Sequence, residues 1–574
     1  MSEKNPLGNN WAQPRPKSRI SKWKVFGAGA LTVAALHWFT PRMPMHCPHS
    51  HHPHSQHMTY VGENIEWKPC GEISNRPLEC SDIDVPMDQF NPHASNKTFN
   101  IAIARLRGKD GSPNLLLNPG GPGASGFEFL HRRGELLSTI VGDGIHLVTF
   151  DPRGINSSTP LASCYPTKEA RQELGPVHDL DMSKDGPEVF AWAHNYVRAC
   201  EDTMGEHGKY INTPQTAADM NSILDAVGQK DMYYWGFSYG TLLGQTYATL
   251  FPERSHRVII DGVVNQFLWY KARLDEEDLV DTENVFDGLL KECFKSGDDC
   301  PLFSLADSWQ GLKNKFVSFV DDLKEQPMNV YVNNSVYGLL DYQKIWYGAL
   351  FPVLYKPERW YMFAEKMEQL LRGNATPALM EYGLDGQGNS DALYTISLND
   401  GLAGPEHWPQ DLNSLLEIVT PTFNRSVFAP DDLVYLFAKQ QWRIPKTHNY
   451  VPRNGVQTAH PLLILTTSYD PVCPLVSARS ALAAFEDSRL VEVKGYGHCS
   501  VAAPSLCLAK HVRGFLYNGT LPAANETQCE VDGPYFKPNG SASMRTFENA
   551  EDQAIHLAQV ELARDADWPR PARL

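Results

Sequence analysis

The sequence has no excess of basic residues. Its 51 lysines and arginines are outnumbered by 67 aspartates and glutamates, which gives a formal net charge of −16. Binding to nucleic acid or to an anionic membrane surface depends on basic patches, so this balance argues against both partners. The acidic charge has two interpretations that totals do not separate: a solvated surface, or an acidic pocket that attracts the ammonium group of a peptide.

Motifs of cofactor-dependent and metal-dependent proteins are absent as well. The cysteines show no C-x-x-C spacing, which argues against zinc sites. The glycine-rich run at residues 118–126 lacks the lysine and Ser/Thr ending of a P-loop, and it does not follow G-x-G-x-x-G in a clean register. The sequence shows no internal repeat and no second catalytic motif. We therefore expect an activity that needs no metal and no organic cofactor.

The N-terminal apolar stretch is short for a membrane span. Residues 1–24 form a basic tail, residues 25–39 are apolar apart from Thr32 and His37, and residues 40–57 form a Pro/His-rich linker. A spanning helix needs about 17–25 residues, yet a basic flank before an apolar core is a targeting signature. No small-x-small cleavage site follows, which favours an uncleaved signal anchor with a cytoplasmic basic end. A cleaved signal peptide is the alternative.

Either route delivers the chain to the secretory pathway, as a single-pass type II membrane protein with a lumenal or extracellular catalytic domain, or as a secreted protein. The 11 cysteines agree with an oxidising compartment. N-x-S/T sequons agree as well, and they lie at Asn96, Asn156, Asn333, Asn374, Asn424, Asn518, Asn525 and Asn539. Local spacing suggests the disulfide pairs Cys70 with Cys80, Cys164 with Cys200, and Cys293 with Cys300, and leaves Cys47 over.

A strand, a G-x-S-x-G turn and a helix follow one another at residues 232–248. Gly236 and Gly240 flank Ser238 in this turn. A serine hydroxyl becomes an effective nucleophile when a strained turn exposes it to a base, and small neighbours prevent a clash. The sequence therefore predicts that Ser238 is the nucleophile of a nucleophile elbow. The alternative, a surface-loop serine, does not explain the partners that follow.

An acid and a base come later in the order that this elbow requires, Ser, then Asp, then His. The apolar run 461–467 predicts a buried parallel strand that ends at Asp470. The next strand, 489–493, leads into a glycine-rich loop that carries His498. We expect His498 to be the general base and Asp470 to orient its imidazole. Asp487 and Glu486 are closer to His498 in sequence, but they lie at a predicted helix end.

The glycine-rich run at residues 118–126 follows a short apolar strand, 115–117. Preorganised N–H donors stabilise the oxyanion that forms during acyl transfer, and glycines let the backbone approach the substrate. Pro122 has no N–H and cannot donate. We therefore predict an oxyanion hole made by the N–H groups of Gly121 and Tyr239.

About two hundred residues separate the strand 257–260 from the strand that begins at Leu462, too many for one connection. Helix-like segments at residues 305–323 and 358–371 predict an inserted helical cap. Glu276, Glu277 and Asp278 could meet a substrate ammonium group or could belong to a solvated helix face. The predicted body comprises residues 58–270 and 456–535, with the cap at residues 271–455 and a C-terminal extension at residues 536–574.

Together these segments resemble the tripeptidyl aminopeptidase-like (TAP-like) branch of the α/β hydrolases, which is related to the proline iminopeptidases. The resemblance runs from about residue 60 to 535 and is carried by residues 67–70, 79–80, 85–88, 118–126, 151–154, 236–244, 261–263, 470–472, 497–498 and 519–522. Pro119 stands where the proline iminopeptidases have the histidine of His-Gly-Gly-Pro-Gly. The resemblance implies an α/β-hydrolase fold, a mostly parallel central sheet flanked by helices, with the cap inserted.

The resemblance also implies hydrolysis of a peptide or amide bond near a free N-terminus through an acyl-enzyme. Ser238 would attack, and His498 would take its proton, protonate the leaving amine and later activate water. The expected partners are peptide substrates with a free N-terminus, and the membrane if the N-terminal segment stays attached. An esterase or lipase-type activity on the same triad is the alternative, and a non-catalytic binding protein is disfavoured because all three residues are present in order. The sequence leaves the oligomeric state open.

One further expectation concerns Cys473 and Cys499, which lie three residues after Asp470 and one after His498. If the triad forms, the two loops are neighbours, so a disulfide between these cysteines is plausible and would hold acid and base in register. The competing pairing is Cys499 with Cys507.

Overall fold

The computed structural model describes residues 58–175, 185–383, 391–429, 433–537 and 545–565. Its framework is a ten-stranded sheet with the order β1-β2-β3-β5-β4-β6-β7-β10-β11-β12. The strands are β1 (Lys68–Ile73), β2 (Arg76–Pro86), β3 (Thr98–Leu106), β4 (Asn114–Asn118), β5 (His146–Phe150), β6 (Met232–Phe237), β7 (Ser255–Asp261), β10 (Leu463–Tyr469), β11 (Arg489–Tyr496) and β12 (Glu526–Glu530).

The sheet changes character along its width. The pairs β1/β2, β2/β3 and β3/β5 are antiparallel, whereas every pair from β5 to β12 is parallel. The central strands β4, β5 and β6 are apolar and almost wholly buried, as parallel strands covered on both faces should be. The predicted mostly parallel sheet flanked by helices is confirmed.

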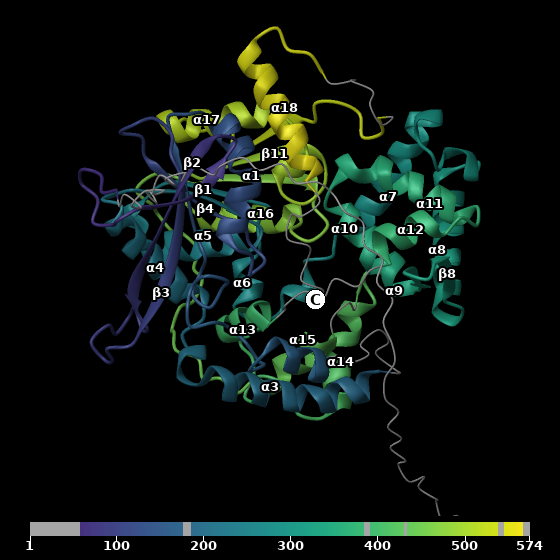
Figure 1. Cartoon of the computed structure of the whole chain (residues 1–574), viewed down its shortest axis with the longest axis horizontal. Helices are drawn as coiled ribbons and strands as arrows, with labels where there is room; N and C mark the ends of the chain where they lie inside the picture. The colour runs from purple at the N-terminus through teal and green to yellow at the C-terminus, as the bar shows by residue number, and fades with distance from the viewer. Residues whose placement is uncertain (1–57, 176–184, 384–390, 430–432, 538–544, 566–574) are drawn as a thin grey trace, which may run out of the picture. The chain divides into compact units, whose positions relative to one another are not determined.

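Helices cover both faces of the sheet (Figure 1). One hydrophobic core contains side chains of α1 (Gly126–Val141), α17 (Leu506–Asn518) and α18 (Ala550–Arg564). A second core contains side chains of α4 (Thr213–Ala226), α5 (Tyr239–Leu250) and α16 (Leu475–Ala484). Helix α18 lies within the C-terminal extension, for which the sequence reading predicted no element.

The segment between β7 and β10 is largely helical and falls into two groups. The first group has a hydrophobic core of its own, centred on residues such as Phe286, Phe316 and Trp346. It comprises α7 (Thr282–Ser296), α8 (Trp309–Glu325), α9 (Tyr342–Ile345), α10 (Phe351–Leu354), α11 (Trp360–Leu371), α12 (Thr376–Tyr382) and a hairpin of β8 (Met328–Asn333) and β9 (Val336–Leu340). Figure 1 shows these helices gathered away from the large sheet.

The second group shares the core of the body. It comprises α13 (Asp391–Asp400), α14 (Leu412–Phe423) and α15 (Leu433–Gln441), which join α3 (Gly186–Gly208) in one hydrophobic cluster. The short helices α2 (Lys168–Leu174) and α6 (Gln266–Trp269) complete the connections. Helices predicted at residues 305–323 and 358–371 correspond to α8 and α11, whereas the hairpin β8–β9 was not predicted.

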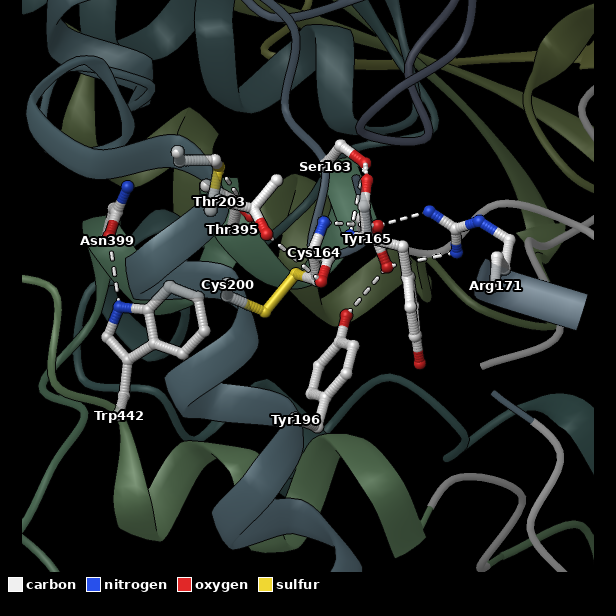
Figure 2. The surroundings of a disulfide bond; sticks show 12 residues. Ser163, Cys164, Tyr165, Arg171, Tyr196, Cys200, Thr203, Thr395, Asn399 and Trp442 are labelled. Atoms are coloured by element: carbon white, nitrogen blue, oxygen red, sulfur yellow. Dashed lines mark hydrogen bonds and ion pairs between the residues drawn. A yellow bond between two sulfur atoms is a disulfide. The ribbon is translucent and has the colours of Figure 1, made fainter. Parts of the chain in front are cut away.

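The Cys164–Cys200 disulfide lies where α3 meets the second group of helices (Figure 2). Beside it, the buried Asp391 carboxylate pairs with Arg171 and accepts hydrogen bonds from the Tyr196 hydroxyl at 2.9 Å and the Cys164 N–H at 2.7 Å. This cluster fastens the N-terminus of α13 to the body.

Among the described residues, no helix is both long and apolar enough to cross a membrane. The predicted basic tail, targeting segment and linker at residues 1–57 lie outside the described residues.

Candidate active site

Ser238 occupies the sharp turn between β6 and α5. Its backbone has φ 55° and ψ −126°, a conformation that costs a non-glycine residue free energy and is typical of strained functional turns. The Ser238 N–H donates to the Asp261 carbonyl at 3.0 Å, which ties the turn to β7. A Cβ on Gly236 would lie 2.3 Å from the Gly240 carbonyl oxygen, and one on Gly240 would lie 2.6 Å from that of Asn118. The elbow therefore requires both glycines.

The glycine-rich loop is in close contact with the backbone of this elbow. Gly120 has φ 98°, and a Cβ there would lie 2.5 Å from the Phe237 carbonyl oxygen and 2.9 Å from Ser238 Cβ. The Gly120 N–H donates to Asn118 Oδ1 at 3.0 Å, so it is already used. Within the described part of the chain, the N–H groups of Gly121 and Tyr239 have no internal acceptor. The oxyanion hole made by these two groups stays a prediction.

Asp470 and His498 follow the neighbouring strands β10 and β11 and meet at the same edge of the sheet. His498 Nδ1 lies 2.9 Å from each carboxylate oxygen of Asp470. The Asp470 carboxylate also accepts three backbone N–H groups. Those of Val472 and Cys473 donate to Oδ1 at 3.0 and 2.9 Å, and that of Cys499 donates to Oδ2 at 2.8 Å. These bonds stabilise the charged carboxylate and fix the imidazole plane.

The first group of helices between β7 and β10 also contacts His498, through Tyr355 just after α10. The His498 N–H donates to the Tyr355 carbonyl at 3.0 Å, and the Tyr355 ring meets the imidazole edge-on with centroids 4.9 Å apart. Asp470 and His498 are 0% and 2% exposed, while Ser238 is half-buried. The Asp470–His498 pair is thus shielded from water, whereas Ser238 is partly exposed to solvent.

Cys473 links the nucleophile to the acid–base pair, a role that the sequence reading did not assign to it. Burial raises the pKa of the Cys473 thiol well above its ordinary value, with further raising from the charges of Asp470 and Asp278, while a hydrogen bond with the Ser238 side chain lowers it. The Cys473 sulfur, a nitrogen of His498 and a carboxylate oxygen of Asp470 all lie within 4.8 Å of one another. Ser238 and His498 therefore flank the same thiol.

The predicted Cys473–Cys499 disulfide is wrong, because both thiols are free and buried. Cys499 faces the backbone of the elbow instead: a Cβ on Gly262 would lie 2.4 Å from its sulfur. The competing Cys499–Cys507 pairing is also wrong, since Cys507 is bonded to Cys529. The three local disulfides, Cys70–Cys80, Cys164–Cys200 and Cys293–Cys300, are confirmed.

Asp261 supports the histidine loop from β7, a second role that sequence reasoning missed. Its Oδ1 accepts the Ser500 N–H and its Oδ2 accepts the Ser500 hydroxyl, both at 2.7 Å. Burial, with a smaller contribution from the charge of Asp470, raises the pKa of Asp261 to about 6. The place of Asp261 at a strand end beside the nucleophile strand was the available signal, since such ends carry functional groups in α/β sheets.

The three acidic residues after β7 have different surroundings. Glu276 pairs with Arg273, and the Glu277 carboxylate accepts hydrogen bonds from Asn265 and the Ser477 hydroxyl. Asp278 is half-buried, and its charge acts on the thiol of Cys473. Asp281 is a fourth acid here: burial, opposed by Asn284 and reinforced by the charge of Asp470, raises its pKa. The charge of Asp278 thus acts on Cys473, and that of Asp470 acts on Asp281.

A cavity of about 810 Å³ lies beside the glycine-rich loop. Its lining includes Gly123 and Ala124 of the loop, Asn156, and Arg171 of α2. The Asn156 side-chain amide donates to Asp151 Oδ2 at 2.8 Å and to Ser125 Oγ at 3.1 Å. The nitrogen that would carry a glycan at this sequon is therefore already hydrogen-bonded, although Asn156 itself is exposed.

Comparisons with known proteins agree with the fold. The family model described as alpha/beta hydrolase fold matches residues 113–304, and the one described as TAP-like protein matches residues 435–529. The chain therefore has an α/β-hydrolase fold, with a TAP-like part at residues 435–529, as the resemblance of its motifs implied.

Three relatives show the range of similarity. Tripeptidyl aminopeptidase of Streptomyces lividans is 34% identical over 226 residues, which cover 37% of this chain and 41% of that protein. Serine protease Hip1 of Mycobacterium bovis is 27% identical over 488 residues, covering 80% of this chain and 90% of that protein. Carboxylesterase B of Mycobacterium tuberculosis is 26% identical, covering 80% and 89%. The alignment with the first relative thus spans less than half of that protein's length.

Proposed function

We propose that the chain is a serine hydrolase that cleaves peptide or amide bonds near a free N-terminus, in the manner of a tripeptidyl or prolyl aminopeptidase. The observation that carries this proposal is the pair of 2.9 Å contacts between His498 Nδ1 and Asp470, which lie in a buried cluster that also contacts Ser238 through Cys473. The Streptomyces lividans relative, a tripeptidyl aminopeptidase, and the Mycobacterium bovis relative, a serine protease, support a peptidase.

In the proposed mechanism, His498 removes the proton of Ser238 as the hydroxyl oxygen attacks the scissile carbonyl carbon. Asp470 stabilises the resulting imidazolium, and the N–H groups of Gly121 and Tyr239 donate to the oxyanion. His498 then protonates the leaving amine. Water, activated by the same imidazole, hydrolyses the acyl-enzyme and regenerates Ser238.

We propose that the negative charge of Asp278 and Asp281 attracts the substrate ammonium group. Acetylation of the N-terminus of an Ala-Ala-Pro amide removes the positive charge of the ammonium group, and with it the attraction to these carboxylates in the transition state. Acetylation should therefore lower kcat/KM about 100-fold, the change expected for roughly 3 kcal/mol. Asp278→Asn should reduce this discrimination, and Asp298→Asn, in the turn after α7, serves as the matched control.

An esterase is the second candidate, and the relative named Carboxylesterase B favours it. A panel of free and acetylated tripeptide amides, assayed beside p-nitrophenyl esters of increasing acyl length, separates the two. Faster turnover of free than of blocked amides supports the aminopeptidase. Equal rates on both, with higher kcat/KM on esters, would reject it in favour of the esterase.

We propose further that residues 25–39 act as a signal anchor or signal peptide that brings the catalytic domain into the secretory pathway. Four disulfides and the exposed sequons Asn96, Asn333 and Asn525 support this proposal. Alkaline carbonate extraction of membranes separates an anchored chain from a secreted one, and a mobility shift after glycosidase treatment reports glycosylation. A cytosolic, unglycosylated chain would reject the proposal.

A further inference from the structure

Cys473 gives this reaction centre a feature that the proposed hydrolysis does not use. A thiol, an imidazole and a carboxylate offer ligand atoms that all lie within 4.8 Å of one another, and the three residues are at most 4% exposed. Thiolate and imidazole are the preferred ligands of Zn²⁺ and of related soft divalent cations. The cluster therefore has the composition of a metal site.

Hydrogen bonding indicates which atoms of the cluster are available to a cation. The two oxygens of Asp470 already accept three backbone N–H groups, and both contact His498 Nδ1. Asp470 is thus the orienting partner of the histidine, whereas His498 Nε2 makes no hydrogen bond within the described part of the chain. Metal-binding histidines commonly have this carboxylate on their other nitrogen.

We propose that Cys473 Sγ and His498 Nε2 form a binding site for Zn²⁺ or another soft divalent cation, with the Ser238 hydroxyl on its open side. Binding replaces the thiol proton, which passes to solvent, with a sulfur–metal bond. The cation also occupies the nitrogen lone pair that the general base needs. Binding should therefore inhibit the enzyme; the inhibition rests on the function proposed above, whereas the binding does not.

Cys499 provides a matched control. It is also a free and buried thiol, and it follows His498 directly in the sequence. Its sulfur, however, faces Gly262 and the backbone of Ser238, and it is not part of the ligand cluster. Replacement of Cys499 should therefore leave cation binding intact, while replacement of Cys473 should abolish it.

The first measurement is ultraviolet absorbance during titration with Cd²⁺, which gives a thiolate-to-metal charge-transfer band only when sulfur binds the ion. All proteins are full-length and carry Cys47→Ser, so that the histidine-rich segment contributes no thiol. The band should appear in this background and in Cys499→Ser, and it should be missing in Cys473→Ser. A band that survives Cys473→Ser, or its absence from the background protein, would overturn the proposal.

The second measurement is the rate at which a fluorophosphonate labels Ser238 in the presence of Zn²⁺, relative to each protein's own rate without metal. Zn²⁺ should slow labelling reversibly, with recovery after addition of EDTA. In Cys473→Ser, Zn²⁺ should no longer slow labelling at the concentrations that slow labelling of the background protein. Equal sensitivity of both proteins would overturn the inhibitory role. If the background protein shows the cadmium band but is not labelled even without metal, the cation site stands and the proposed hydrolase function is rejected.

Discussion

The two sides of the candidate active site are held in different ways. The nucleophile side depends on close backbone contact: Gly120, Gly236 and Gly240 lie where any side chain would come within 2.3–2.6 Å of a carbonyl oxygen. The acid–base side depends on hydrogen bonds, since Asp470 and Asp261 receive backbone and side-chain donors from the loops after β10 and β11. Substitutions that add volume should therefore impair the nucleophile side. Substitutions that change charge or protonation should impair the acid–base side.

Among these substitutions, Asp470→Asn on the acid–base side should cause the largest loss of kcat. The side chain keeps its size, but its amide cannot stabilise an imidazolium and favours the wrong tautomer of His498. We expect kcat to fall about 10⁴-fold, as in other Ser-His-Asp enzymes. The thermal unfolding midpoint should fall as well, because the amide nitrogen leaves at least one buried backbone N–H without an acceptor. Steady-state kinetics and calorimetry measure both. A loss below tenfold would show that Asp470 is not the orienting acid.

Gly120→Ala tests the contact side, because the added methyl group would lie 2.5 Å from the Phe237 carbonyl oxygen. The loop must move, which displaces the donor N–H of Gly121, and loss of one oxyanion donor costs about 10²–10³ in kcat. Gly111→Ala is the control, since Gly111 also has a positive φ, 78°, but no atom within 4 Å of an added Cβ. Equal kinetic effects of the two substitutions would contradict the contact argument.

Asp261→Asn should produce a smaller effect that depends on pH. The pKa of Asp261 is raised from 3.8 to about 6 in the fold, so ionisation of this carboxyl destabilises the folded state relative to the unfolded chain. The stability that the neutral form provides is lost as the pH rises from about 4 to above 6. The free energy of unfolding of the wild type, minus that of Asp261→Asn, should therefore decrease over this range.

Urea unfolding of both proteins at pH 4.5 and pH 7 measures this difference. A difference that stays constant, or that increases with pH, would show that Asp261 is not buried with a raised pKa. Ser500→Ala is a useful companion, because it removes only the hydroxyl donor to Asp261 and keeps the charge.

The features that could be predicted from the sequence are those fixed by local pattern and chain order. The G-x-S-x-G turn between a strand and a helix located Ser238, and the order of the strands led to Asp470 and His498 at one edge of the sheet. The short-range disulfides were also predictable, because the two cysteines of each pair lie close together along the chain.

Contacts between distant segments could not be predicted in the same way. The sequence places Cys473 and Cys499 on loops that become neighbours, but it does not determine where their side chains point. In the structure the two thiols are not bonded to each other, and the Cys499 sulfur faces Gly262. The Asp261–Ser500 pair joins residues 239 positions apart, and the bond of Tyr355 to the His498 backbone depends on how the cap packs. Such contacts arise from tertiary packing and leave no periodic signal in the sequence.

The most direct test of the account is the site of fluorophosphonate labelling, read by peptide mass spectrometry in the wild type and in Ser238→Ala. Only an activated serine reacts rapidly with this reagent, so the site of the adduct identifies the nucleophile. We predict a single adduct on the peptide that contains Ser238, and no adduct in the folded Ser238→Ala variant. An adduct on another serine, or labelling that survives the substitution, would contradict the assignment of the nucleophile and with it the proposed triad.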